Sequence, residues 1–190
     1  MKKVLILGDR GYVGSRLVND LRDGYDVAGV DIGWFTDGPS SDYKDLDKIY
    51  IEKFDVIICV AGHSSVGTCV GGAVQGPWLN NVTNFVNLLD KVKPEQLVIY
   101  ASSASVYGNT IPGMHYREKL INFSPINNYD LTKYVLDLHA QSYINRGYKI
   151  VGLRFGTVNG WAPYIRTDVM INAMYVSAKM SGQIVVKNKQ

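Results

Sequence analysis

Val4-Leu5-Ile6-Leu7-Gly8-Asp9-Arg10-Gly11-Tyr12-Val13-Gly14 is the stretch that decides the fold. Its four consecutive apolar residues predict a strand that is covered on both faces. The three glycines that follow, spaced GxxGxxG, predict a tight turn whose backbone approaches a ligand closely. Apolar residues then recur at helical spacing as far as Leu21, which predicts a helix over 12–21. A strand, a glycine turn and a helix in this order favour a pyrophosphate site, because the helix N-terminus attracts anions.

The composition narrows the class of protein. The chain has 190 residues, which suits one domain, or one domain and a fragment. With 46% hydrophobic residues it can bury a sizeable core. The net charge of +3 comes without any basic cluster, so we expect no nucleic-acid partner. Two cysteines, Cys59 and Cys69, make no disulfide framework, and we expect no metal site.

The apolar runs also bear on location. None is long enough for a membrane span, so we expect no membrane association. The basic start is followed by an apolar run that ends at Gly8, too early for a signal peptide. We therefore expect a cytoplasmic protein in a reducing compartment.

Strand-like and helix-like segments alternate along the chain. We predict strands at 4–7, 25–30, 55–60, 97–101, 149–155 and 184–186, and helices at 12–21, 81–92, 127–143 and 167–180. Glycine-rich loops are expected at 32–42 and 67–76, the second of them flexible. This alternation predicts an α/β fold with a doubly wound, Rossmann-type parallel sheet.

Two residues near the glycine turn point to different dinucleotides. Asp31 ends the second predicted strand, 17 residues after Gly14, where a carboxylate can accept hydrogen bonds from an adenosine ribose. That position favours NAD. Arg10 lies inside the turn, where a guanidinium can pair with the extra phosphate of NADP, so NADP remains an alternative. Ala61-Gly62 after the third strand is small enough to admit a cofactor, and His63 is interpreted as polar lining.

Tyr129 and Lys133 form a YxxxK pattern in the long predicted helix. Their separation of four residues places both side chains on one helical face. A phenol with a pKa of about 10 is a poor base at neutral pH, but a nearby ammonium and a positive nicotinamide ring favour phenolate. Tyr129 can then take a proton from a substrate hydroxyl while hydride leaves its carbon. Ser103, after the fourth strand, can hydrogen-bond the same oxygen.

These motifs together resemble the extended short-chain dehydrogenase/reductases of the NAD-dependent epimerase/dehydratase family. The resemblance covers residues 1–165. It rests on the glycine turn, Asp31, Asp45-Leu46, Val60-Ala61-Gly62, Asn81-Val82, Ser102-Ser103-Ala104-Ser105-Val106-Tyr107-Gly108, the YxxxK pair and Leu153-Arg154-Phe155. It implies a tightly held NAD(P) and Ser103, Tyr129 and Lys133 as the catalytic triad. The expected cofactor-binding residues are Gly8, Arg10, Gly11, Tyr12, Val13, Gly14, Asp31, Ile32, Asp45, Leu46, Val60, Ala61, Gly62, Asn81, Ala101, Tyr129 and Lys133.

The resemblance also implies a nucleotide-sugar substrate. The 4,6-dehydratases of the family carry Asp-Glu where this chain has Ala104-Ser105, so the pattern looks more like a sugar 4-epimerase. Hydride would leave C4, the 4-keto sugar would turn over, and hydride would return to its other face. Ser103, Ser105 and Thr157 are the expected substrate contacts, although Thr157 stands where such epimerases have Asn.

The resemblance further implies a C-terminal substrate lobe, of which this chain has only the start. We expect an NAD(P)-binding domain over 1–160 and an incomplete lobe over 161–190. Many family members are homodimers that pair through helices corresponding to 81–92 and 127–143. Three alternatives remain: an NADPH-dependent keto-sugar reductase, a dehydratase relative, and a truncated NAD(P)-binding protein without turnover.

Overall fold

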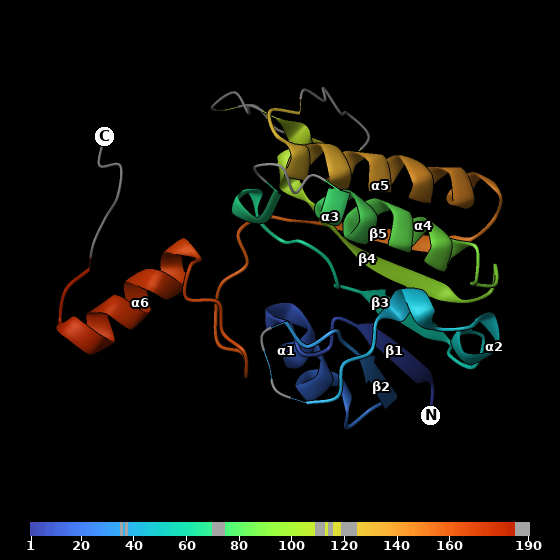
Figure 1. Cartoon of the computed structure of the whole chain (residues 1–190), viewed down its shortest axis with the longest axis horizontal. Helices are drawn as coiled ribbons and strands as arrows, with labels where there is room; N and C mark the ends of the chain where they lie inside the picture. Colours follow the sequence, from blue (N-terminus) through green and yellow to red (C-terminus); the bar gives the residue numbers. More distant parts are fainter. Residues whose placement is uncertain are drawn as a thin grey trace.

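The computed structural model describes residues 1–34, 36, 38–69, 75–108, 113, 116–118 and 125–184. Five strands form one sheet in the order β2-β1-β3-β4-β5, and every neighbouring pair is parallel (Figure 1). The doubly wound parallel sheet predicted from the sequence is therefore confirmed. The strands are β1 Lys3–Leu7, β2 Asp26–Val30, β3 Val56–Cys59, β4 Leu97–Ser103 and β5 Lys149–Phe155.

The helical segments lie between these strands and after them. The α-helices are α1 Tyr12–Leu21, α2 Lys48–Ile51, α3 Gln75–Trp78, α4 Asn84–Leu89, α5 Asn128–Asn145 and α6 Met170–Ser181. Short turns of 3-10 helix occupy Tyr43–Asp45, Val66–Cys69 and Ala104–Tyr107, and a π-helical turn occupies Leu79–Thr83. None of the helices in the described ranges is long and apolar enough to cross a membrane.

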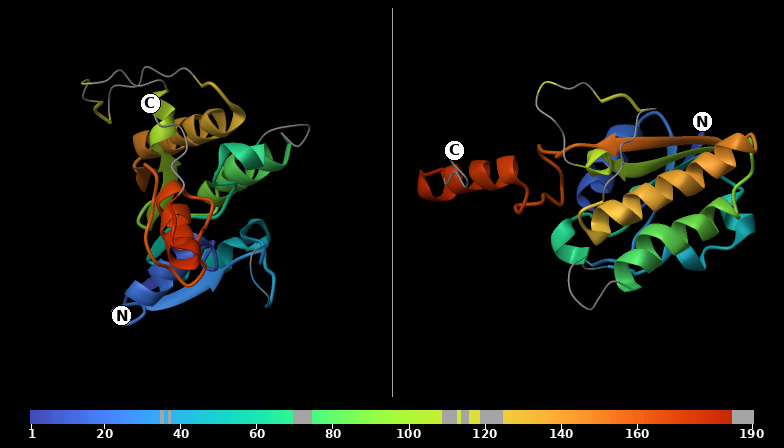
Figure 2. Two further views of the ribbon diagram at one scale, coloured as in Figure 1. Left: turned by 90° about the vertical axis from the view of Figure 1, so that its left-hand side faces the viewer. Right: turned by 90° about the horizontal axis from the view of Figure 1, so that it is seen from above.

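Helices cover the sheet from two sides. Alternate strand residues such as Leu5, Val98 and Ile150 join the apolar core that α4 and α5 complete with Phe85 and Leu136. These two helices run side by side, whereas α1 lies beside β1 and β2, and α6 extends away from the sheet (Figures 1 and 2). β1 is buried on both faces, which explains its uninterrupted apolar sequence.

The strand order sets the position of the site. The chain runs from β1 outward to β2 and then returns to the opposite side of β1 to form β3. Such a reversal separates the connections that leave adjacent strands, and ligands of open α/β sheets bind in the resulting crevice at the carboxyl ends of the strands. Here the crevice lies beyond Leu7 and Cys59.

Some predicted segments differ in detail. The helix predicted over 81–92 is the π-turn Leu79–Thr83 followed by the shorter α4, and the one predicted over 167–180 begins three residues later, at Met170. Of the predicted strand 184–186, residue 184 is not in a strand and the rest lies outside the described residues. The expected flexible loop 67–76 also lies partly outside them, and its described ends belong to short helical turns.

Candidate functional site

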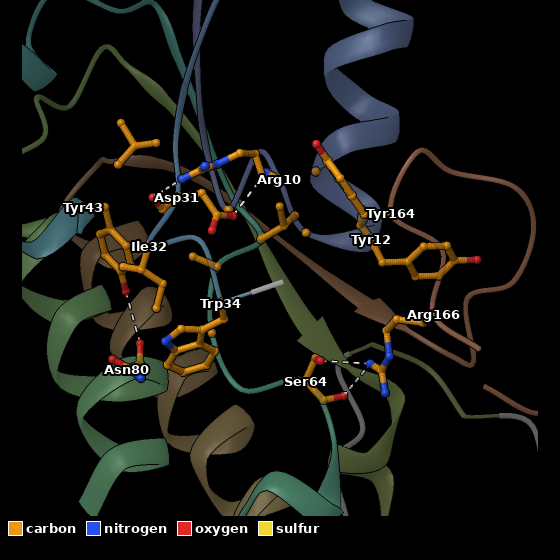
Figure 3. A pocket seen from close by; sticks show the side chains of 18 of the residues that line it. Arg10, Tyr12, Asp31, Ile32, Trp34, Tyr43, Ser64, Asn80, Tyr164 and Arg166 are labelled. Carbon is orange, nitrogen blue, oxygen red and sulfur yellow. Dashed lines mark hydrogen bonds between the residues drawn. The ribbon is translucent and has the colours of Figure 1, made fainter. Parts of the chain in front are cut away.

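A cavity of about 670 Å³ opens at the carboxyl ends of β1, β2 and β3, and its size is within the usual range of roughly 300–1,000 Å³ for ligand sites. Figure 3 shows Arg10 and Asp31 on one side of it, and Tyr12, Tyr164 and Arg166 on the other. Three parts of the chain form its walls: the glycine turn, the segments that follow β2 and β3, and residues 163–168. The lining residues are Gly8, Arg10–Gly14, Val30–Ile32, Trp34, Ser41–Tyr43, Val60–Gly62, Ser64, Ser65, Asn80 and Pro163–Asp168.

The glycine turn is tied into the sheet by its backbone. Gly8 N donates to Val30 O at 2.8 Å, and Gly11 N donates to Gly8 O at 3.1 Å. A Cβ at Gly14 would lie 1.9 Å from Gly8 O, and one at Gly8, whose φ is +89°, would lie 2.7 Å from the backbone N of Ala61. At these two positions only glycine fits. The N-cap of α1, Gly11, offers no side-chain acceptor to the first turn, so the N–H groups there are available to an anion.

Arg10 and Asp31 are bound to each other and to the loop after β2. The carboxylate of Asp31 accepts from Arg10 N at 3.1 Å and from Gly33 N at 2.7 Å. The Arg10 guanidinium donates to Asp31 O at 2.8 Å and to Pro39 O at 2.5 Å. The guanidinium therefore fixes the course of this loop rather than standing free in the cavity. Burial and the nearby charge of Asp31 raise the pKa of the Asp9 carboxyl next to it.

Ser103, Tyr129 and Lys133 come together beside the cavity. Ser103 ends β4 and hydrogen-bonds Tyr129, and Ser105 Oγ donates to Ser103 Oγ at 2.9 Å. Lys133 lies one turn after Tyr129 on α5, with its Nζ 2.9 Å from Ala101 O and 5.9 Å from the centre of the Tyr129 ring. The separation of four residues thus places both side chains on one face of the helix, as predicted.

The electrostatics of this cluster differ from the simple expectation. Burial raises the pKa of Tyr129 above its usual value in the protein alone, and burial lowers the pKa of Lys133. The hydrogen bond from Ser103 and the charge of Arg166 oppose the first of these shifts. Burial disfavours the charged form of either group, so both shifts oppose the pairing of a phenolate with an ammonium.

Asn81 connects the segment after β3 to α5. Its side chain is 2% exposed. Its Oδ1 accepts from His63 N at 2.8 Å, and its Nδ2 donates to His63 O and to Thr132 Oγ1, each at 3.1 Å. Thr132 Oγ1 in turn donates to Tyr129 O at 2.8 Å. Asn81 lies in the π-turn, a feature that is frequent at functional sites.

Arg166 reaches the site from the C-terminal part of the chain. Its guanidinium donates to Ser64 Oγ at 2.9 Å (Figure 3) and forms an ion pair with Asp168. Its charge acts on both Tyr129 and Tyr12. The sequence analysis did not identify this residue, because nothing in the pattern around it predicts that residues 160–168 fold back over the glycine turn.

The family follows from a comparison with known proteins. A model of the NAD dependent epimerase/dehydratase family matches residues 4–188. The chain belongs to this family. The resemblance inferred from the motifs is thus confirmed, and the cofactor of the family is NAD.

The individual relatives differ from this chain in sequence by similar amounts. The chain is 29% identical to UDP-glucose 4-epimerase of Lactobacillus helveticus over 83% of its own length and 52% of that protein. It is 31% identical to UDP-glucuronate 4-epimerase 4 of Arabidopsis thaliana over 87% of its own length and 43% of that protein. The structure of UDP-glucuronic acid 4-epimerase from Bacillus cereus, in complex with UDP-glucuronic acid and NAD, superimposes with a TM-score of 0.80 at 25% identity, over 93% of this chain and 63% of that one. The chain spans about half the length of the curated relatives that it matches.

The residues expected to bind the family's cofactor fall into three groups. Most of them line the cavity, namely Gly8, Arg10, Gly11, Tyr12, Val13, Gly14, Asp31, Ile32, Val60, Ala61 and Gly62. Asn81, Ala101, Tyr129 and Lys133 lie behind or beside it in the contacts described above. Asp45 and Leu46 are outside the lining, which Ser41, Asp42 and Tyr43 form at this point.

The three expected substrate contacts are also separated. Ser103 hydrogen-bonds Tyr129 and accepts from Ser105 Oγ, whereas Thr157 is exposed and its carbonyl accepts from Asn159 Nδ2 at 3.4 Å. Sequence reasoning missed Trp34, Tyr43, Ser64 and Asn80 in the lining. Ser64 and Asn80 each lie close in sequence to a predicted cofactor residue, and this proximity was the available signal.

Proposed function

We propose that this protein is an NAD-dependent epimerase that inverts a hydroxyl-bearing carbon of a UDP-sugar. The observation that carries the proposal is the hydrogen-bonded group of Ser103 and Tyr129, with Lys133 one turn away, beside a cavity built on a glycine turn. UDP-sugar 4-epimerases recur among the relatives, and one of the similar structures holds UDP-glucuronic acid and NAD.

The residues present fit a dinucleotide. There is no room for a Cβ at Gly8 or Gly14, and the absence of side chains there lets a pyrophosphate approach the backbone of the turn and the N-terminus of α1. The Asp31 carboxylate lines the cavity one strand away, in the position of a ribose acceptor. The Arg10 guanidinium is engaged by two backbone carbonyls, which leaves it poorly placed to receive the extra phosphate of NADP. These contacts support NAD over NADP.

The chain's own residues would handle the proton and the substrate oxygen. Bound NAD supplies the acceptor and donor of hydride. Tyr129, as phenolate, would take the proton of the sugar hydroxyl as the C–H bond is broken, and would return that proton when the carbonyl is reduced on its other face. Ser103 would donate a hydrogen bond to the same oxygen and hold it near Tyr129. Lys133, fixed by Ala101 O, would favour the phenolate by its charge.

Arg166 bears on the choice of sugar. It is a cation in the cavity lining whose charge acts on Tyr129, so it lies on the sugar side of the site in this scheme. Its guanidinium already forms two parallel hydrogen bonds with the Asp168 carboxylate, at 2.9 and 2.5 Å, so a carboxylate on the sugar would have to displace Asp168 to bind in the same way. A hexuronic acid linked to UDP is our preferred substrate because glucuronate epimerases recur among the relatives.

The reaction can be tested directly. Purified protein with NAD is incubated with UDP-glucuronic acid or UDP-glucose, and the sugar is analysed by NMR for inversion at C4. We expect inversion without net change of absorbance at 340 nm, because hydride returns to the sugar. Tyr129→Phe should bind NAD normally and lose turnover, whereas Tyr175→Phe, at an exposed position on α6, should keep it. Full activity in Tyr129→Phe would show that the mechanism is wrong.

The same assay separates the alternatives. A keto-sugar reductase would consume NADPH stoichiometrically at 340 nm, and a dehydratase would release a product that has lost water. Ala104-Ser105, in place of an acid pair, argues against dehydration. NAD binding without any conversion of either sugar would favour a binding protein.

We also propose that two copies pair through α4 and α5. These helices lie side by side on the outside of the sheet (Figure 1), and α5 exposes Leu138 at 52% and Ile144 at 39%. Light scattering coupled to gel filtration should give twice the mass of the 21.1 kDa chain. A mass of one chain over the micromolar range would contradict the pairing.

A further inference from the structure

Asn172 is an almost fully buried polar residue near the start of α6. Its side chain is 3% exposed, although its neighbours Met170 and Ile171 are 65% and 47% exposed. The Oδ1 accepts from Gly160 N at 3.0 Å. The Nδ2 donates to Tyr12 Oη at 3.0 Å and to the carbonyl of Arg166 at 2.9 Å. Both the oxygen and the nitrogen of the amide are therefore used, and the partners come from two parts of the chain, the start of α1 and residues 160–166.

The Tyr12 hydroxyl closes this set of contacts into a ring. It accepts from Asn172 Nδ2 and donates to Gly160 O at 2.8 Å. The backbone N–H and C=O of Gly160 are thus both bonded, one to Asn172 and the other to Tyr12. We call this ring of Tyr12, Gly160, Arg166 and Asn172 the clasp.

The clasp joins the glycine turn to the C-terminal segment that lines the cavity. Tyr12 begins α1 and belongs to the glycine turn. Arg166 lies on the same side of the cavity as Tyr12 and reaches the segment after β3, where its guanidinium donates to Ser64 Oγ at 2.9 Å (Figure 3). Because Asn172 holds the Arg166 backbone and the Tyr12 side chain at the same time, any movement of the roof segment 160–168 displaces both.

We propose that Asn172 is a positioning residue that couples the cofactor turn to Arg166 at the sugar end of the cavity. The proposal rests on the proposed function for the identity of the two ligands. Asn172 itself touches neither ligand and acts through Tyr12 and Arg166. Its role is to keep the roof in one arrangement while the glycine turn holds the cofactor.

The clasp also bears on the catalytic phenol. Burial raises the pKa of Tyr129 and the hydrogen bond from Ser103 opposes that rise; Cys69 and Asp130 raise the pKa further, the charge of Arg166 lowers it, and Lys133 lies 5.9 Å from the ring centre. Loss of the Asn172 contacts frees the Arg166 backbone and removes this favourable charge from its fixed place. The phenol then ionises at a higher pH, so the rising limb of the pH profile of turnover shifts to higher pH.

The test compares Asn172→Ala and Tyr12→Phe with a control on the same helix. Ser177→Ala is suitable because the Ser177 hydroxyl donates only to a nearby carbonyl, that of Gln183. Three quantities are measured: amide hydrogen exchange at Gly160, NAD affinity by calorimetry, and the pH profile of UDP-glucuronic acid turnover. One lost hydrogen bond corresponds to a factor of about ten in an equilibrium. We expect about tenfold faster exchange at Gly160 in Asn172→Ala, which removes the acceptor of the Gly160 N–H, and about tenfold weaker NAD binding in both clasp variants.

The pH profile gives the readout that a purely structural role would not move. Turnover of Asn172→Ala should rise at higher pH than in the wild type, and adding Asn172→Ala to Arg166→Met should shift the profile no further. An unchanged NAD affinity and pH profile in Asn172→Ala, with only a lower melting temperature, would overturn the proposal. If Asn172→Ala does not fold, Tyr12→Phe still tests the proposal, because this variant keeps the buried Asn172 side chain.

The outcomes also separate this inference from the proposed function. If the wild type binds NAD but converts no sugar, the function is wrong, and exchange and NAD affinity still decide the role of Asn172. If the wild type is an active epimerase and the clasp variants match it in all three measurements, only the inference on Asn172 is wrong.

Discussion

Replacement of Asn81 by alanine removes three hydrogen bonds at once. The Oδ1 contact to His63 N is 2.8 Å long, and the two Nδ2 contacts, to His63 O and Thr132 Oγ1, are each 3.1 Å. A typical hydrogen bond contributes about 1 kcal/mol net, and a buried group left unpaired costs roughly 1–3 kcal/mol. Because Asn81 is only 2% exposed, water does not readily replace it. We expect the free energy of unfolding to fall by about 3 kcal/mol.

The assay is unfolding in urea, monitored by circular dichroism, with the free energies of wild type and variant compared at a common m-value. For a chain of this length, about 3 kcal/mol corresponds to a fall in melting temperature of roughly 6–12 °C. Asn145→Ala is the matched control, because its amide oxygen accepts a single exposed hydrogen bond from Gln141 at 2.9 Å. Its unfolding free energy should change by less than about 0.5 kcal/mol.

The NAD affinity adds a second readout. Asn81 holds the backbone of His63 next to the lining residue Gly62, so the affinity should fall together with the stability. If Asn81→Ala lowers the free energy of unfolding by less than about 1 kcal/mol, the reasoning is refuted, because water or other groups of the protein must then replace the three contacts.

Three further changes test other parts of the site. Gly14→Ala should abolish NAD binding and lower the free energy of unfolding by more than about 2 kcal/mol, because its Cβ would lie 1.9 Å from Gly8 O. Gly24→Ala is the control and should be neutral, because a Cβ there would have nothing within 4 Å. Equal behaviour of the two variants in calorimetry and thermal melts would contradict this prediction. Burial lowers the pKa of Lys133, so between that value and about 10.4 the unfolded chain holds a proton that the native chain has lost. Wild-type stability should therefore rise with pH relative to Lys133→Met across this window, and parallel melting curves from pH 7 to 10 would refute it. Burial also raises the pKa of Cys59 to about 11, so iodoacetamide at pH 8 should alkylate Cys59 only after unfolding, as peptide mass mapping will show.

The parts that sequence analysis predicted depend on local rules. Val4–Leu7 is apolar without interruption because β1 is covered on both faces, and this pattern needs no knowledge of the neighbours. Tyr129 and Lys133 share a face because they are four residues apart on one helix. The spacing of the glycines likewise predicted the turn, which the structure forms against Ala61.

The parts that it did not predict depend on the path of loops. Arg10 was open to two interpretations, and only the course of the loop to Pro39 shows that its guanidinium is engaged by backbone carbonyls. The π-turn around Asn81 escaped because apolar periodicity does not distinguish bonding to the fourth residue from bonding to the fifth. Arg166 and Asn172 meet Tyr12 across a separation of about 150 residues, which no local pattern encodes.

The last strand of the sheet has a consequence for handling the protein. Among the residues that the structure describes, no strand pairs with the outer edge of β5, and Val151 and Leu153 there are 46% and 42% exposed. An open edge with apolar side chains is a template for strands of other molecules. Self-association of concentrated stocks should therefore begin at β5, and a lysine in place of Val151 should extend their shelf life without touching the cavity.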